Sequence, residues 1–168
     1  MPPKNPRNLT KLPRSEQQPL NEYLNLKQSW CFRWTTLEWR HYLFHIVWIW
    51  CGSWCLASPI ATESFPPTQS PGKFVIATSA GASLVLALNL LWVYLGWSYI
   101  CDRLERKTVY YEETGWYDGQ FWTKSSEELV KDRLIATYQV KPILQRLRRT
   151  FEVQGLFLLS GYLVWNFL

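Results

Sequence analysis

The stretch FVIATSAGASLVLALNLLWVYLGWSYI, residues 74–100, decides the fold because it contains no charged side chain. A helix of 27 residues extends about 40 Å at 1.5 Å per residue, which exceeds the roughly 30 Å hydrocarbon core of a bilayer. Small side chains at 80–83 allow close approach of a neighbouring helix. Trp and Tyr gather toward its far end, as expected of an aromatic belt at a membrane interface. The stretch therefore predicts a transmembrane helix.

Two further apolar segments flank this helix. Residues 41–60 are long enough to cross a bilayer as a first span, with Pro59 at its exit. Residues 61–73, which contain three prolines and a glycine, predict a connecting loop. Residues 151–168 form a shorter third segment, which either crosses or enters only partway. The predicted fold class is a mainly α membrane protein with about three transmembrane helices, the second of them over 74–100.

The first forty residues change character along their length. Residues 1–14 are rich in proline and basic side chains, which predicts a disordered tail. Residues 15–40 mix aromatic and polar side chains, which is typical of an N-terminal arm lying along a membrane interface.

The polar segment 101–150 predicts a small β-hairpin followed by an amphipathic helix. Strand-forming residues at 108–111 and 121–123 enclose glycines and an Asp-Gly turn signal. Ser125 and Glu128 have the spacing of a capping box, which predicts a helix start. An apolar stripe follows on that helix, and Pro142 should end or kink it. The stripe consists of Val130, Leu134 and Tyr138.

The basic residues predict the orientation of the chain. Residues 1–40 hold seven Lys or Arg and residues 101–150 hold ten, whereas Lys73 is the only one between 41 and 100. The positive-inside rule then places the N-terminus and 101–150 on the cytoplasmic or stromal side. Because the basic residues flank apolar segments, the net charge of +5 indicates membrane topology and not nucleic-acid binding.

Few residues carry a chemical signal. His45, inside the first span, is a candidate ligand for the magnesium of a chlorophyll or for a haem iron. The favoured alternative is a histidine hydrogen-bonded to backbone or water. Asn89 predicts an interhelical hydrogen bond within the second span. Catalytic triads, nucleotide-binding loops and metal-ligand patterns are absent from the sequence, so we expect a protein that is not an enzyme and has neither a metal site nor an obligatory cofactor.

Three linked motifs carry a family resemblance. They are the run 110–120, YYEETGWYDGQ, continuing to Lys124 and Asp132–Arg133–Leu134; the stretch 13–23; and Lys141–Pro142–Ile143–Leu144 with Arg146–Leu147. With these motifs the chain resembles the hypothetical chloroplast reading frame thirty-six family, also called conserved-in-the-green-lineage-and-diatoms twenty-seven-like proteins. The resemblance implies a multi-pass protein of the cyanobacterial thylakoid or plasma membrane or of the plastid thylakoid, with a part in forming or maintaining photosynthetic complexes.

The leading hypothesis is an accessory or assembly factor, embedded in the lipid bilayer, that docks on a photosynthetic membrane complex. A pigment- or haem-binding protein that uses His45 and a small transporter subunit remain the alternatives. We expect partner binding at the polar segment, through Tyr111, Glu112, Glu113, Gly115, Trp116, Tyr117, Asp118, Gly119, Gln120, Trp122, Asp132 and Arg133.

Overall fold

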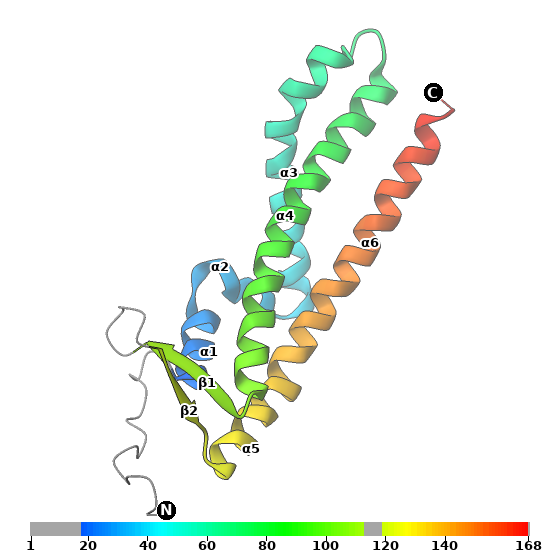
Figure 1. Ribbon diagram of the computed structural model, residues 1–168. Coiled ribbons are helices and arrows are strands. Elements are labelled where there is room, and N and C mark those ends of the chain that lie inside the picture. Colours follow the sequence, from blue (N-terminus) through cyan, green and yellow to red (C-terminus); the bar gives the residue numbers. More distant parts are fainter. Residues whose placement is uncertain (1–17, 113–118, 168) are drawn as a thin grey trace, which may run out of the picture.

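The computed structural model describes residues 18–112 and 119–167, and most of them are helical. Three long helices lie side by side, with α4 between the other two in sequence and in contact with both (Figure 1). They are α3 (Trp39–Ser64), α4 (Pro71–Glu105) and α6 (Lys141–Trp165).

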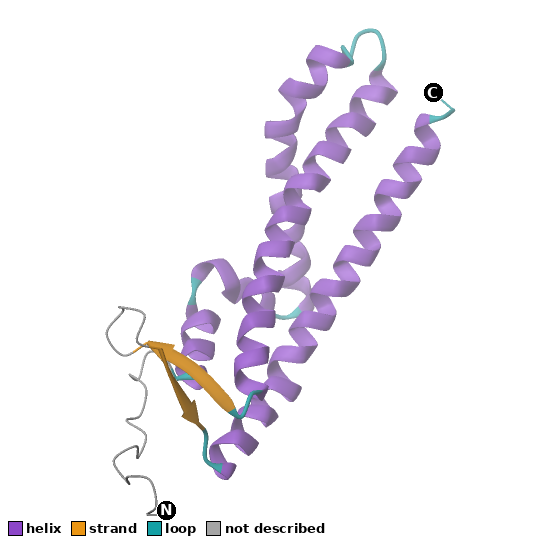
Figure 2. Ribbon diagram, viewed as in Figure 1, coloured by secondary structure: helices purple, strands orange, loops and turns teal. Residues whose placement is uncertain are grey.

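Shorter elements gather at one end of these helices (Figure 2). They are α1 (Pro19–Gln28), α2 (Trp30–Arg33), η3 (Trp34–Thr36), β1 (Thr108–Glu112), β2 (Gly119–Thr123), α5 (Ser126–Ile135) and the π-helical turn η4 (Ala136–Val140). The strands pair antiparallel, with Val109 opposite Trp122 and Tyr110 opposite Phe121. The predicted hairpin is therefore confirmed.

Two helices, α3 and α4, are long and apolar enough to cross a membrane, judged by length and composition. Both extend beyond the predicted limits, and only residues 65–70 connect them. The observed connection is shorter than the predicted loop 61–73, because neither Pro59 nor Pro71 breaks a helix. Pro59 lies inside α3, and Pro71 occupies the first turn of α4, where its missing N–H leaves no helical hydrogen bond unmade.

These two helices bury little of their apolar surface. Only 11% of the most apolar window of α3 and 28% of that of α4 are buried inside the protein. The core helix of a water-soluble domain would be mostly buried. The large exposed side chains include Phe44, Val47, Trp48, Leu56 and Ile60 on α3, and Leu84, Leu88, Trp92 and Leu95 on α4.

The third apolar segment reaches the far end of the bundle. The rings of Phe65 and Trp165 meet edge to face at 5.1 Å between centroids, and the Lys73 ammonium lies 5.8 Å from the Trp165 ring. The end of α6 is therefore level with the turn between α3 and α4 (Figure 1). Unlike them, α6 does not qualify as a membrane span by composition, because Arg146, Arg148, Arg149 and Glu152 occupy its first half.

Pro142 does not end the helix that begins after the capping box. The chain stays helical from 126 to 165, and Pro142 lies in the first turn of α6. A proline ring ordinarily clashes with the carbonyl four residues before it. The wider π-helical turn η4, which directly precedes α6, changes the hydrogen-bonding pattern at that point.

The N-terminal arm folds back onto α4. Phe32 is buried against Gly96, where an added Cβ would come within 2.5 Å of the Phe32 ring, so this close approach requires glycine. The Trp97 indole is fully buried and donates a hydrogen bond to Thr35 Oγ1 at 2.9 Å. Trp30, in contrast, faces outward. The arm is thus part of the core at this end of the bundle.

Side chains of α6 hold the junction between the arm and α3. Arg146 Nη1 donates to the Leu37 carbonyl at 2.7 Å, and its guanidinium lies 5.2 Å from the ring of Tyr42. The hydroxyls of Tyr42 and Thr150 are hydrogen-bonded at 2.7 Å. The first half of α6 is therefore docked by polar and aromatic contacts.

Candidate interaction site at the head of the bundle

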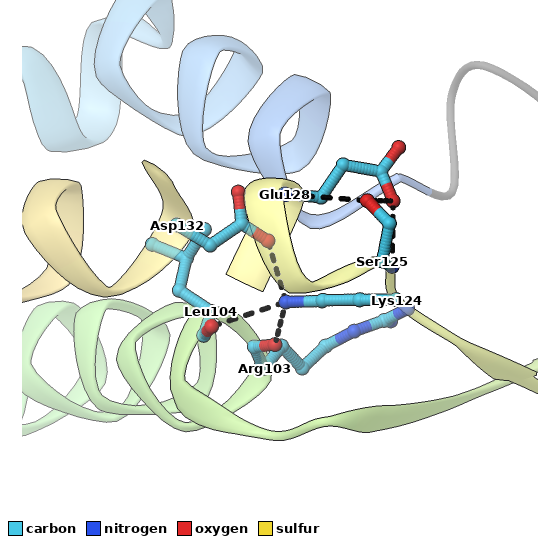
Figure 3. Close-up of polar contacts among 6 residues, drawn as sticks. All are labelled: Arg103, Leu104, Lys124, Ser125, Glu128 and Asp132. Carbon is cyan, nitrogen blue, oxygen red and sulfur yellow. Dashed lines mark hydrogen bonds and ion pairs between the residues drawn. The ribbon is translucent and has the colours of Figure 1, made fainter. Parts of the chain in front are cut away.

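We call β1, β2 and α5 the head. Its centre is a buried ion pair in which Lys124 Nζ lies 2.5 Å from Asp132 Oδ2 (Figure 3). The same ammonium donates to the carbonyls of Arg103 and Leu104, at 2.9 and 3.0 Å. Lys124 follows β2 and Asp132 belongs to α5, so one side chain joins the hairpin, α5 and the end of α4.

The Lys124 ammonium has three hydrogen-bond acceptors around it. The Lys124 side chain has no exposed surface, and a buried ammonium is costly unless each N–H is satisfied. Here three oxygens accept from it. Two of them are carbonyls in the last turn of α4, where the helix dipole favours a positive charge.

The capping box begins α5 beside this ion pair (Figure 3). Ser125 Oγ accepts from the Glu128 backbone N–H, and the Glu128 carboxylate accepts from the Ser125 backbone N–H at 3.0 Å. This confirms the predicted helix start. The cap fixes where α5 begins, and therefore where Asp132 lies relative to Lys124.

A second ion pair ties the arm to the end of α4. Arg103 Nη1 lies 2.9 Å from the Glu22 carboxylate and donates to the Tyr99 hydroxyl at 2.7 Å. Burial raises the pKa of Glu22, and the attraction of Arg103 only partly offsets this effect. Arg103 Nη2 also approaches the Tyr110 carbonyl of β1, at 3.5 Å. The arm, α4 and the hairpin thus meet at one guanidinium.

The two faces of the hairpin differ. Val109 and Trp122 form a small buried cluster on the inner face. On the outer face the rings of Tyr110 and Phe121 pack against each other at 5.6 Å between centroids, yet Phe121 remains 74% exposed. A cross-strand aromatic pair of this kind stabilises a hairpin and also presents a stiff apolar surface.

The apolar stripe of α5 also faces outward, because the opposite side of the helix is the one that packs. Asp132, Ala136 and Val140 are buried at four-residue spacing. The stripe residues Val130, Leu134 and Tyr138 precede these by two positions, about 200° around a helix of 3.6 residues per turn, and are exposed. The helical segment therefore buries Asp132 with Ala136 and Val140 and exposes the predicted apolar stripe.

The predicted partner-binding residues divide into three groups. Glu113, Gly115, Trp116, Tyr117 and Asp118 lie outside the described residues. The backbones of Tyr111, Glu112, Gly119 and Gln120 pair across the two strands. Of the remainder, Arg133 is exposed, whereas Trp122 and Asp132 are buried and hold the head together.

His45 is half-buried in α3 and stacks on Trp34, with 6.1 Å between ring centroids. Its Nδ1 lies 2.8 Å from the His41 carbonyl, which is the backbone hydrogen bond favoured by sequence. Because a carbonyl only accepts, Nδ1 carries the proton there and Nε2 of a neutral ring keeps its lone pair.

A polar contact inside the bundle involves a residue that sequence reasoning missed. Gln154 of α6 is 9% exposed, and its amide donates to the Ser83 carbonyl of α4 at 2.5 Å. Trp50 of α3 donates to Ser83 Oγ at 3.3 Å, so all three long helices meet there. The Asn89 side-chain oxygen, expected to bond between helices, is buried with no hydrogen-bond partner among the described residues. The only signal for Gln154 was its isolation in an apolar segment.

The chemistry of the head suits binding. Within 18–112 and 119–167, no three His, Cys, Asp or Glu side chains come together as a metal site would require. The buried ions of the head are paired with each other or with backbone, and its exposed surface carries Tyr110, Phe121, Val130 and Leu134 among charged and polar side chains.

The sequence of this chain is similar to those of known proteins. The family described as "CGLD27-like: Conserved in the green lineage and diatoms 27" matches residues 11–153. A chloroplastic protein of Arabidopsis thaliana, named for conservation in the green lineage and diatoms, is 38% identical over 91% of this chain, which spans only 47% of that relative's length. Uncharacterized ycf36 proteins of Pyropia yezoensis and Cyanophora paradoxa are 45% and 46% identical, over 87% and 83% of this chain and 88% and 87% of theirs. No solved structure matches.

Proposed function

We propose, from the premise that this chain belongs to the CGLD27-like family of chloroplast-related proteins, that it is a non-enzymatic accessory or assembly factor of photosynthetic membranes. It would lie in the thylakoid of a plastid or cyanobacterium. The bundle would be embedded in lipid, and the head would dock on a photosynthetic membrane complex. The observation that carries this proposal is the outward-facing apolar surface of both bundle and head.

Membrane embedding accounts for the exposed side chains of the bundle. Water-soluble proteins rarely expose large contiguous apolar surfaces, whereas in a bilayer such surfaces are solvated. The contacts of Trp165 with Phe65 and Lys73 support α6 crossing with α3 and α4. The described part of the arm, the head, the basic end of α4 and the basic start of α6 lie at one end of the bundle, which supports placing them on the cytoplasmic or stromal side.

A docking role accounts for the head. Tyr110 and Phe121 form a rigid aromatic pair, and rigid aromatic side chains supply much of the binding energy at protein interfaces. The buried ion pair of Lys124 holds the hairpin and α5 against α4, so the surface is organised before a partner arrives. The function proposed for the polar segment thus rests mainly on Tyr110, Phe121 and the α5 stripe.

Replacing both Tyr110 and Phe121 by Ser is expected to reduce recovery of photosystem subunits or pigment-synthesis enzymes with the tagged chain by about thirtyfold or more. The estimate follows because truncating a central aromatic contact commonly costs about 2 kcal/mol or more. The measurement is quantitative mass spectrometry of the complex purified from mildly solubilised native thylakoids.

The matched control is Thr108→Ser, an exposed position in β1 without an aromatic ring. It should leave the recovered proteins unchanged. If the wild-type chain migrates alone, or if the double variant recovers the same proteins in the same amounts, docking through the head is refuted.

A second function, binding of a pigment or haem at His45, is compatible with the bond from Nδ1 to the His41 carbonyl, which leaves Nε2 free to ligate. Metal-ligating histidines usually donate their other ring N–H in this way. If this function holds, the purified protein absorbs visible light and His45→Ala removes the absorption band. A colourless preparation from native membranes would exclude it.

A further inference from the structure

A groove of about 510 Å³ separates the first half of α4 from the second half of α6. Its walls include Ile76 and Ala80 of α4, and Phe157, Gly161 and Trp165 of α6. The volume lies within the roughly 300–1,000 Å³ typical of ligand pockets. The Ser160 hydroxyl in its wall donates to the carbonyl of Phe157, so it is already satisfied within the helix. The groove is therefore an apolar slot, suited to a hydrocarbon chain.

A positive charge lies at one end of this slot. Lys73, two residues before the groove wall begins at Val75, holds its ammonium over the ring of Trp165, which closes the same end. In the part of the chain that the structure describes, Lys73 forms no ion pair with a carboxylate. It is also the only Lys or Arg between 41 and 100. A lysine beside a tryptophan at a helix end is typical of the headgroup level of a membrane.

We infer that this groove binds an anionic membrane lipid, with one acyl chain in the slot and the headgroup beside Lys73. The inference rests on the proposed membrane embedding but is independent of docking by the head. Charge complementarity selects the occupant, because an apolar helix of a partner or of a second copy would gain nothing from the ammonium. One lysine at the membrane surface is expected to give about a fivefold preference for an anionic lipid over a zwitterionic one.

The test uses the full chain in neutral detergent, titrated separately with palmitoyl-oleoyl phosphatidylglycerol and phosphatidylcholine and observed by native mass spectrometry. The wild-type chain should bind one phosphatidylglycerol about fivefold more tightly than one phosphatidylcholine. Lys73→Gln should abolish the preference, and Lys73→Arg should keep it because the charge remains.

Two glycines of α6 provide a matched pair of variants for the slot itself. A Cβ at Gly161 would lie 3.8 Å from Ile76 Cγ2, an ordinary contact, so Gly161→Leu directs a side chain into the groove. A Cβ at Gly155 meets nothing within 4 Å, and Gly155 does not line the groove. Gly161→Leu should weaken binding of both lipids at least tenfold, and Gly155→Leu should leave both unchanged.

Equal affinities of the wild-type chain for the two lipids would overturn the inference. The inference would also be overturned if the two leucine variants had equal effects. The same holds if the spectra show the chain as a dimer without lipid. Extraction of native membranes with alkaline carbonate distinguishes failure of the lipid-site inference from failure of the proposed membrane embedding. Release of the chain would contradict membrane embedding, whereas a retained chain without lipid preference contradicts only the lipid site.

Discussion

Replacing Lys124 by Met is expected to destabilise the head by about 3–5 kcal/mol, the usual cost of breaking a buried ion pair from one side. Methionine fills a similar volume but leaves the Asp132 carboxylate buried without its cation and removes the donor to the Arg103 and Leu104 carbonyls. The loss should appear as faster hydrogen–deuterium exchange in β1, β2 and α5, measured by mass spectrometry on the chain in nanodiscs. Exchange in α3 should be unchanged.

A second variant separates charge burial from packing. Changing Lys124 to Met and Asp132 to Leu together removes both ions, and such apolar replacements are often neutral or stabilising. The double variant should therefore recover much of the protection that the single variant loses. Lys131→Met, at an exposed position of α5, is the control. A single variant that exchanges like this control would show that the ion pair does not hold the head.

The elements of the fold were largely predictable because their signals are local. Charge-free segments predicted the apolar helices, alternating strand residues predicted the hairpin, and Ser125 with Glu128 predicted the start of α5. The limits of the helices were less predictable. Proline signals a break by its missing N–H, but Pro71 occupies a first turn, where that N–H has no partner to lose, and Pro142 follows directly on the π-helical turn η4 within a continuous helix.

The contacts between elements were not predictable, because they depend on how the elements pack. Alternation from Trp122 through the end of β2 indicates that Lys124 points to the same inner side, but nothing local shows that its ammonium is buried against Asp132 and the carbonyls of α4. The stripe of Val130 and Leu134 indicated an amphipathic helix but not which side packs. The side that packs carries Asp132, which pairs with Lys124, together with Ala136 and Val140 of the core. Candidate site residues chosen by motif therefore include Trp122 and Asp132, which are buried.

Replacing Trp97 by Ala is expected to release the N-terminal arm from α4, at a cost of about 3–5 kcal/mol for the buried indole. Trp97 is fully buried, its N–H bonds to Thr35, and its ring lies 6.2 Å from that of Tyr23. Truncation leaves a cavity between α4 and the arm and removes the donor to Thr35. Because the arm packs mainly on this end of α4, local opening is cheaper than loss of the whole bundle. The hydrogen-exchange protection factors of the amides of residues 19–36 should fall at least a hundredfold.

The matched control for this variant is Trp48→Ala, which removes the same ring from an outward-facing position on α3. It should leave exchange of the arm unchanged, because among the described rings Trp48 contacts only Phe44, edge to face. Trp97→Phe keeps most of the volume but lacks the N–H, so it should show a smaller loss that isolates the hydrogen bond to Thr35. If the arm stays protected in Trp97→Ala, its docking rests on Glu22 and Arg103, and Arg103→Gln should release it instead. Either result identifies which contact couples the arm to the bundle.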